Sequence, residues 1–156
     1  MKLKMKKNIL YLFVIILAIV VIYLIFNRTN KSSIERLTDL WIYNVTQKND
    51  PSAVYNMFCS DGNLVGTVSQ TIRRGSGILD YFRFFAKLPN IQVIDKKYTI
   101  DKVTSNVYMN TAFVTWKWDG LDEPIIARMS FIFRNNCIYQ LHSSALPEVN
   151  EDLRQI

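Results

Sequence analysis

An uninterrupted run of 18 apolar residues, Ile9 to Phe26, contains no charge, no proline and no glycine. As an α-helix rising 1.5 Å per residue it would cover about 27 Å, close to the roughly 30 Å of a bilayer's hydrocarbon core. A cleaved signal peptide has a shorter apolar region and a small-residue cleavage site, which Asn27–Asn30 does not offer. A buried globular helix would carry a polar stripe, and this run has none. We therefore predict an uncleaved transmembrane anchor over residues 9–26.

The basic residues beside this run indicate its orientation. Four lysines lie in residues 1–8, whereas three basic residues lie within the ten residues after the run. Such a bias favours a cytoplasmic N-terminus. We predict a basic cytoplasmic end (1–8), a polar linker (27–33) and a domain on the opposite side of the membrane. Three Asn-x-Ser/Thr sequons, at Asn27, Asn30 and Asn44, would then lie on the side where glycosylation occurs, although the first two are close to the membrane.

The net charge of +6 belongs to the N-terminus, because six of the 19 Lys and Arg residues precede residue 32 and no acidic residue does. The remaining chain is neutral, so we expect no nucleic-acid partner. One His and two Cys cannot supply a zinc site, and we expect no metal or cofactor. For Cys59 and Cys137 we expect two free buried thiols, with a disulfide left open if the domain faces an oxidising compartment.

Hydrophobic periodicity predicts helices first and strands afterwards. Apolar residues at helical spacing begin at Ile34, and a proline-started helix and a third helix follow at 51–58 and 76–87. A turn is predicted at 60–63 and a short strand at 64–68. Four longer strands with short turns are predicted at 92–103, 107–118, 125–133 and 138–144. This order predicts an α+β fold in which three helices pack on a curved antiparallel sheet.

Several motifs in this order resemble the NTF2-like cone-shaped folds, and among them the SnoaL-like group and the association domain of calcium/calmodulin-dependent kinase II. The matching pieces are Trp41, Asp50-Pro51, Phe58–Gly62, Ile78–Phe82, Ala127–Phe131 and His142–Glu148. The last piece is similar to the family's His-His-Ser-Ser-x-x-Pro-Glu ending, except that Leu141 replaces the first His. The resemblance implies an NTF2-like domain over residues 34–148, a C-terminal tail over 149–156, a partly polar pocket, and dimers or larger assemblies formed through the sheet.

Strand alternation groups the candidate site residues. Arg128 and Ser130 share one face of their strand, and Gln140 and His142 share one face of the next. If both faces line the cone interior, the four side chains form one polar cluster in which Arg128 clamps a small anion. The alternative is that Arg128 pairs with a carboxylate or faces water. His142 is a weak catalytic candidate because its ordinary pKa suits acid–base chemistry near neutral pH.

These observations predict a membrane-anchored NTF2-like binding or assembly module that forms a homodimer through its sheet. One alternative is a structural membrane or envelope protein with a vestigial pocket. The other is a small SnoaL-like isomerase or hydratase-type enzyme, with His142 as base and Arg128 stabilising negative charge. Fold alone does not choose among these functions, and the non-enzymatic reading is the one we favour.

Overall fold

The structure, a computed structural model, describes residues 2–67 and 69–145, with side chains for residues 11–24, 31–67 and 71–145. The predicted tail, 149–156, lies outside these residues. The chain divides into two compact units, Met1–Ser33 and Ile34–Ile156. The described elements are α1 (Lys2–Thr46), α2 (Pro51–Tyr55), β1 (Phe58–Gly66), β2 (Ser69–Arg74), α3 (Ser76–Phe85), β3 (Gln92–Lys102), β4 (Val107–Lys117), β5 (Ile125–Arg134) and β6 (Cys137–Ala145).

The first unit consists of the N-terminal part of α1. The backbone stays helical through residues 27–33, where we predicted a linker, because no glycine or proline interrupts the helix there. Every described side chain from residue 11 to 24 is exposed. Among the residues with described side chains, no helix is both long enough and apolar enough to cross a membrane. The predicted span of 9–26 extends beyond them, since the side chains of residues 9, 10, 25 and 26 lie outside the described part.

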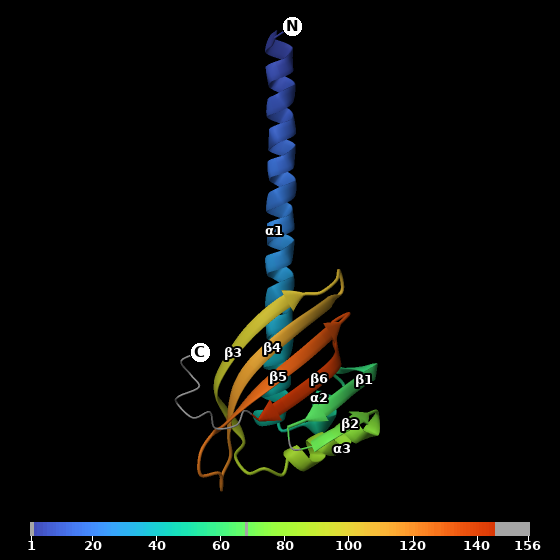
Figure 1. Cartoon of the computed structure of the whole chain (residues 1–156), viewed down its shortest axis with the longest axis vertical. Helices are drawn as coiled ribbons and strands as arrows, with labels where there is room; N and C mark the ends of the chain where they lie inside the picture. The colour runs from blue at the N-terminus through green and yellow to red at the C-terminus, as the bar shows by residue number, and fades with distance from the viewer. Residues whose placement is uncertain (1, 68, 146–156) are drawn as a thin grey trace. The chain divides into compact units, whose positions relative to one another are not determined.

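The second unit contains a six-stranded sheet in the order β2-β1-β6-β5-β4-β3 (Figure 1). Every neighbouring pair is antiparallel except β1 and β6, which are parallel. The α+β prediction is confirmed, and so are its four long strands, but the wholly antiparallel sheet is wrong. The parallel pair arises because β1, from the first half of the domain, lies beside the last strand.

The predicted turn at 60–63 is also wrong, because these residues lie within β1. The β1–β6 register shifts between Phe58 and Asn63, so the strand is irregular where we expected a turn. Gly62 is needed at this irregularity, since a Cβ atom there would lie only 2.8 Å from the backbone oxygen of Ile138.

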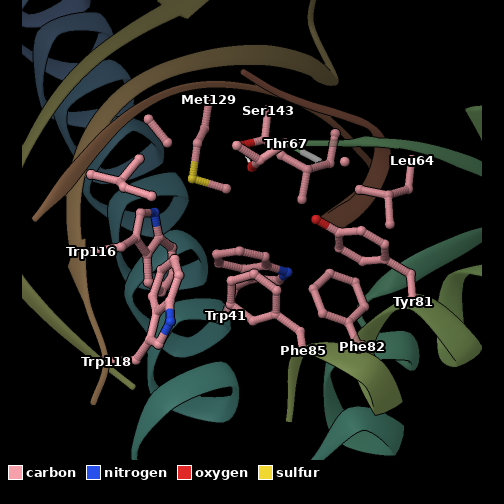
Figure 2. Close-up of a pocket in the computed structure, with 14 residues that line it drawn as sticks. Trp41, Leu64, Thr67, Tyr81, Phe82, Phe85, Trp116, Trp118, Met129 and Ser143 are labelled. Atoms are coloured by element: carbon pink, nitrogen blue, oxygen red, sulfur yellow. Dashed lines mark hydrogen bonds between the residues drawn. The ribbon is translucent and has the colours of Figure 1, made fainter. Parts of the chain in front are cut away.

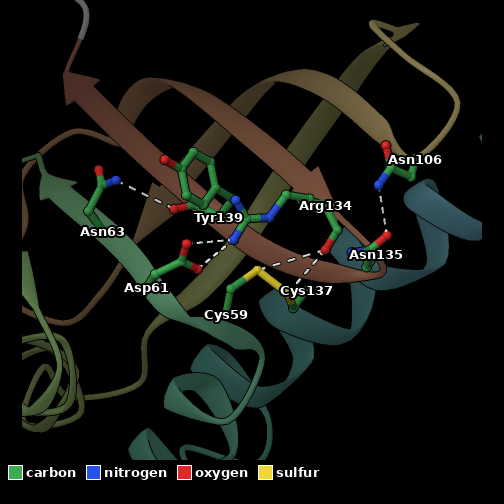
Figure 3. Close-up of a disulfide and its surroundings, with 8 residues drawn as sticks. All are labelled: Cys59, Asp61, Asn63, Asn106, Arg134, Asn135, Cys137 and Tyr139. Atoms are coloured by element: carbon green, nitrogen blue, oxygen red, sulfur yellow. Dashed lines mark hydrogen bonds and ion pairs between the residues drawn. A yellow bond between two sulfur atoms is a disulfide. The ribbon is translucent and has the colours of Figure 1, made fainter.

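A disulfide joins β1 to β6 at this irregular pairing (Figure 3). Cys59 and Cys137 are 78 positions apart in sequence, yet their Cα atoms lie 5.1 Å apart. The expectation of two free thiols is therefore wrong, because the parallel pairing of β1 with β6 places the two residues side by side. Beside the disulfide, Nη2 of Arg134 donates to both carboxylate oxygens of Asp61, at 2.5 and 2.7 Å. The Arg134 guanidinium also lies 4.2 Å from the ring centre of Tyr139.

Residues 34–46 of α1 pack on one face of the sheet, which we call the inner face. Trp41 contacts Phe131 of β5 and Trp116 of β4 by ring edges, at centroid distances of 5.3 and 6.2 Å. Deeper in the same contact, Asn110 Nδ2 donates to the hydroxyl of Thr38 at 2.7 Å. Around these contacts, the apolar sides of the helices meet the apolar side of the strands on the inner face and form the hydrophobic core.

A polar contact fixes the same helix to β3. The Tyr98 hydroxyl donates to Asp39 Oδ1 at 2.6 Å, and Lys96 Nζ contacts the same oxygen. Burial, together with the negative charge of Asp39, raises the pKa of the Tyr98 hydroxyl above its ordinary value, so it stays protonated and donates.

The sequon at Asn44 is not accessible in the folded domain. Asn44 is only 6% exposed, and its Nδ2 donates to the sulfur of Met57 at 3.5 Å. A glycan needs a surface position, so modification of the folded domain at Asn44 is not expected. The side chains of Asn27 and Asn30 lie outside the described residues.

Candidate functional site

A cavity of about 60 Å³ lies between the inner face of the sheet and the helices (Figure 2). Its lining comes from α1, α3 and four strands, and it is mainly aromatic and aliphatic. The lining residues are Trp41, Leu64, Gly66, Thr67, Tyr81, Phe82, Phe85, Trp116, Trp118, Ile125, Ala127, Met129, Leu141 and Ser143. All three tryptophans of the chain are among them.

Trp41 forms the centre of an aromatic cluster in this cavity. Besides Trp116 and Phe131, its ring meets Phe82 edge to face at a centroid distance of 5.8 Å. Phe85 meets Trp116 in the same way at 5.7 Å. Edge-to-face contacts between buried rings each contribute about 0.5–1.5 kcal/mol beyond the area they bury, so these rings hold the cavity wall in place.

The hydroxyl groups of the lining lie where the chain leaves β1. The hydroxyls of Thr67 and Ser143 share a hydrogen bond of 2.6 Å. Tyr81 is 8% exposed, and burial raises the pKa of its hydroxyl, although contacts with Thr67 and the positive charge of Arg73 partly oppose the rise. The Arg73 guanidinium lies 5.0 Å from the centre of the Tyr81 ring, and Arg73 is not among the lining residues.

Gly66 allows the Tyr81 ring to lie directly against β1. A Cβ atom at position 66 would come within 2.4 Å of two ring carbons of Tyr81, which is far inside van der Waals contact. Any side chain at this position would therefore displace Tyr81, and with it the polar side of the cavity.

The four predicted site residues lie together, as strand alternation predicted, but on the opposite face of the sheet. Ser130 pairs directly with His142, and Ile132 with Gln140, in the β5–β6 register. Arg128 and His142 are exposed, and Ser130 and Gln140 are half-buried. None of the four lines the cavity. The prediction that they point into the cone is wrong, because the alternating residues Ala127, Met129 and Leu141 face the helices instead.

The described lining is poor in groups that take part in acid–base chemistry near neutral pH. Among its described residues there is no Asp, Glu, His, Lys, Arg or Cys. The Ser143 hydroxyl contacts Thr67 and has no imidazole beside it in the described cavity, so it lacks the base that a serine nucleophile needs. Across the described residues, no cluster of three or more His, Cys, Asp or Glu side chains could hold a metal ion.

One signal in the sequence could have identified the cavity side. The helices beginning at Ile34 and Ser76 carry apolar faces, which must be buried on the apolar side of the sheet. In the strand from Ile125 to Arg134, that side is Ala127, Met129, Phe131 and Phe133, all of which are buried. The polar side, with Arg128 and Ser130, is left to face away. Leu141 is one of the residues on the cavity side. It stands where the ending that this sequence resembles has the first of two His residues, so the lining has an apolar group there in place of a polar one.

Solved structures share this architecture. A candidate calcium/calmodulin-dependent protein kinase II association domain from Xanthomonas campestris aligns with a TM-score of 0.64 and 24% identity, over 74% of this chain and 87% of that chain. An NTF2-like protein of unknown function from Pseudomonas putida aligns with a TM-score of 0.67 and 11% identity, over 79% and 97%. The orange carotenoid protein of Anabaena, in a structure binding canthaxanthin, aligns with a TM-score of 0.63 and 15% identity, over 77% and 38%.

No protein-family model matches the sequence, and no curated protein matches it. The fold of the domain is NTF2-like, and the predicted resemblance is confirmed at the level of fold. Proteins with this fold differ in function, so identities of this size show architecture and not activity.

Proposed function

We propose that this chain is a membrane-anchored binding module whose cavity holds a small, uncharged, apolar molecule. The observation that carries the proposal is the lining, which is apolar and aromatic apart from Thr67, Ser143, the Tyr81 hydroxyl and the indole N–H groups. Burying apolar ligand surface there is favourable by about 25 cal/mol per Å². A carboxylate or phosphate would lose its hydration without gaining a cation from the described lining. An uncharged ligand therefore replaces the anion predicted from Arg128.

One solved structure of similar fold is consistent with an apolar ligand. The orange carotenoid protein binds canthaxanthin, which is a largely hydrocarbon molecule. The likeness concerns the fold alone. It supports one point, which is that this architecture can accommodate an apolar ligand.

The cavity volume favours a second candidate function, a structural membrane protein with a vestigial pocket. An apolar cavity of about 150 Å³ holds benzene, whereas this one measures about 60 Å³. It admits a small group, and a larger ligand must extend past half-buried residues of the lining, among them Trp118 and Ile125. Under the structural alternative no ligand enters at all.

Thermal melts of the full chain in lipid nanodiscs test the choice. We expect 2-pentanone to raise the melting temperature in a saturable way, relative to the same addition to a non-binding reference protein. Pentanoate, which has a similar length and a negative charge, should have no such effect. Arg128→Ala and His142→Ala, on the outer face, should retain the response to 2-pentanone.

Two results would contradict the proposal. Stabilisation by pentanoate that Arg128→Ala removes would favour the anion site on the outer face. No saturable response to 2-pentanone, or to other small uncharged molecules such as 1-butanol, would favour the structural alternative.

The membrane anchor is part of the same proposal. Three observations support a span over residues 9–26 with the domain outside the cytoplasm. The run is apolar and long enough. The described side chains from residue 11 to 24 are all exposed, which leaves an apolar helix surface that a bilayer would cover. The domain contains the Cys59–Cys137 disulfide, and disulfides persist mainly in oxidising compartments.

We also propose that two copies associate through the outer face of the sheet. Phe113 and Ile126 are 40% and 47% exposed on neighbouring strands of this face. They lie on the same side as Arg128 and Ser130, and Phe113 pairs with Arg128 in the register. Apolar groups mixed with polar ones are typical of the interfaces between protein copies, so the outer face is the surface that we expect to be paired.

A further inference from the structure

The buried edge of Trp41 carries a hydrogen-bond donor without a partner. Among the described residues, Trp41 Nε1 is the one fully buried side-chain nitrogen or oxygen of the cavity lining that makes no hydrogen bond. Trp41 is only 2% exposed. Figure 2 shows the nitrogen end of its ring directed toward the space between Tyr81 and Phe82. A buried donor is unfavourable when it is left unpaired, so this atom specifies what the cavity requires.

The other polar groups nearby already interact with one another. The hydroxyls of Thr67 and Ser143 are bonded together, and the Tyr81 hydroxyl interacts with Thr67. The indole N–H can only donate. What the Trp41 N–H lacks is therefore an acceptor. A charged acceptor would be costly in this apolar lining, where no described cation faces it.

We propose that the ligand enters with an uncharged acceptor oxygen, a carbonyl, and that Trp41 Nε1–H donates to it. This inference rests on the proposed binding function and defines the chemistry of its ligand. The cavity of about 60 Å³ accommodates a small carbonyl-bearing end such as an acetyl group. The aromatic walls contact the apolar part of the molecule, and the rest extends past half-buried lining residues such as Trp118.

The test compares 2-pentanone with 2-methyl-1-pentene, in which a CH₂ group replaces the carbonyl oxygen. The full chain is placed in lipid nanodiscs, and binding is followed by tryptophan fluorescence, since all three tryptophans line the cavity. The ratio of the two dissociation constants is measured for wild type and for Trp41→Phe. Partition into the lipid affects both proteins equally and cancels in this comparison.

We expect Trp41→Phe to shift the ratio by about tenfold against the ketone, the effect of losing one hydrogen bond. Trp118→Phe is the matched control, because it removes another indole from the same cavity and should leave the ratio unchanged even if both affinities change. In wild type with ¹⁵N-labelled indoles, the ketone should move the Trp41 Nε1–H signal downfield, and the alkene should not. This second readout does not depend on the stability of a variant.

The outcomes separate the inference from the function on which it rests. If both molecules bind wild type but Trp41→Phe leaves the ratio unchanged and the ketone does not move the Trp41 signal downfield, the donor role is wrong while the binding function stands. In that case a water molecule, and not the ligand, would be the hydrogen-bond partner of the Trp41 indole. If neither molecule binds, the binding function is wrong and the inference falls with it.

Discussion

Asp50 shows how one side chain can organise the start of a short helix. Its Oδ1 accepts from the backbone N–H of Ala53 at 2.8 Å, and its Oδ2 lies 3.0 Å from Lys48 Nζ. The Ala53 hydrogen bond, followed by the Lys48 contact, lowers the pKa of the Asp50 carboxyl below its ordinary value of 3.8. A carboxyl whose pKa is lowered by folding stabilises the folded state fully when the pH is above its ordinary pKa. This stabilisation is lost as the pH falls through the lowered pKa of the folded state.

We therefore expect Asp50→Ala to lower the free energy of unfolding at pH 7, and its difference from wild type to shrink below about pH 3. Asp50→Asn keeps an acceptor for the Ala53 N–H and should lose less at pH 7. Urea unfolding of both variants across this pH range checks the expectation. A deficit for Asp50→Ala that is equal at pH 7 and pH 2.5 would show that the charged cap is not its source.

At this scale, strand alternation by itself predicts which residues share a face but not which face is inside. Alternation groups Arg128, Ser130, Gln140 and His142 correctly, because strand geometry fixes parity. It does not say which side of the strand meets the helices. We placed the polar side inward because the resemblance implied a partly polar pocket, whereas this cavity contains Leu141 where the family has a His.

At the scale of elements, the disulfide joins two strands from opposite ends of the domain. We expect the double variant Cys59→Ser/Cys137→Ser to be less stable by about 2–4 kcal/mol, because the bond closes a long loop in the unfolded chain. Thermal melts with and without dithiothreitol measure this effect. The reductant should lower the melting temperature of wild type and leave the double variant unaffected. Two thiols that titrate in the non-reduced, unfolded wild-type protein would contradict the bond.

Association through the outer face is tested by adding a charge to it. We expect Ile126→Glu to give a monomer and wild type a dimer, since a buried unpaired charge disfavours the interface. Light scattering of the full chain in detergent, corrected for the detergent, measures the mass. Phe84→Glu is the matched control, because Phe84 is a similarly exposed apolar residue, on α3. A wild-type monomer at micromolar concentration, or equal masses for all three proteins, would count against pairing through this face.

The strands that the sequence predicts well are those with strong local patterns. The four from residue 92 onward contain β-branched and aromatic residues and are separated by turn residues. The sequence does not predict β2, because Ser69–Arg74 contains a single apolar residue, Ile72. Part of β1 is predicted as a turn, because Asp61-Gly62-Asn63 is typical of turns. Its strand conformation depends on pairing with β6, which is far away in sequence.

For the whole molecule, the proposal requires an anchor that spans a membrane, with the N-terminal end and the domain on opposite sides of it. Protease added to the cytoplasmic face of sealed vesicles should leave the domain intact, and carbonate should not extract the chain, because residues 9–26 would span the bilayer. A variant with Ile16→Lys and Val20→Lys should become extractable, since charges at the bilayer centre are costly. Digestion from the cytoplasmic face would reverse the orientation, and extraction of the wild type would remove the anchor.

The central claim, that the inner cavity binds a small uncharged molecule, is tested most directly at two adjacent residues of β5. Ala127 lines the cavity, whereas Ile126 lies on the outer face. Ala127→Leu should fill the cavity, at a cost in stability of about 1–3 kcal/mol, and Ile126→Leu should leave it open. Tryptophan fluorescence of each full-length protein is titrated with 2-pentanone, after a melt has shown that both variants are folded. We predict a saturable response in wild type and Ile126→Leu and none in Ala127→Leu; an equal response in all three, or none in any, would contradict the claim.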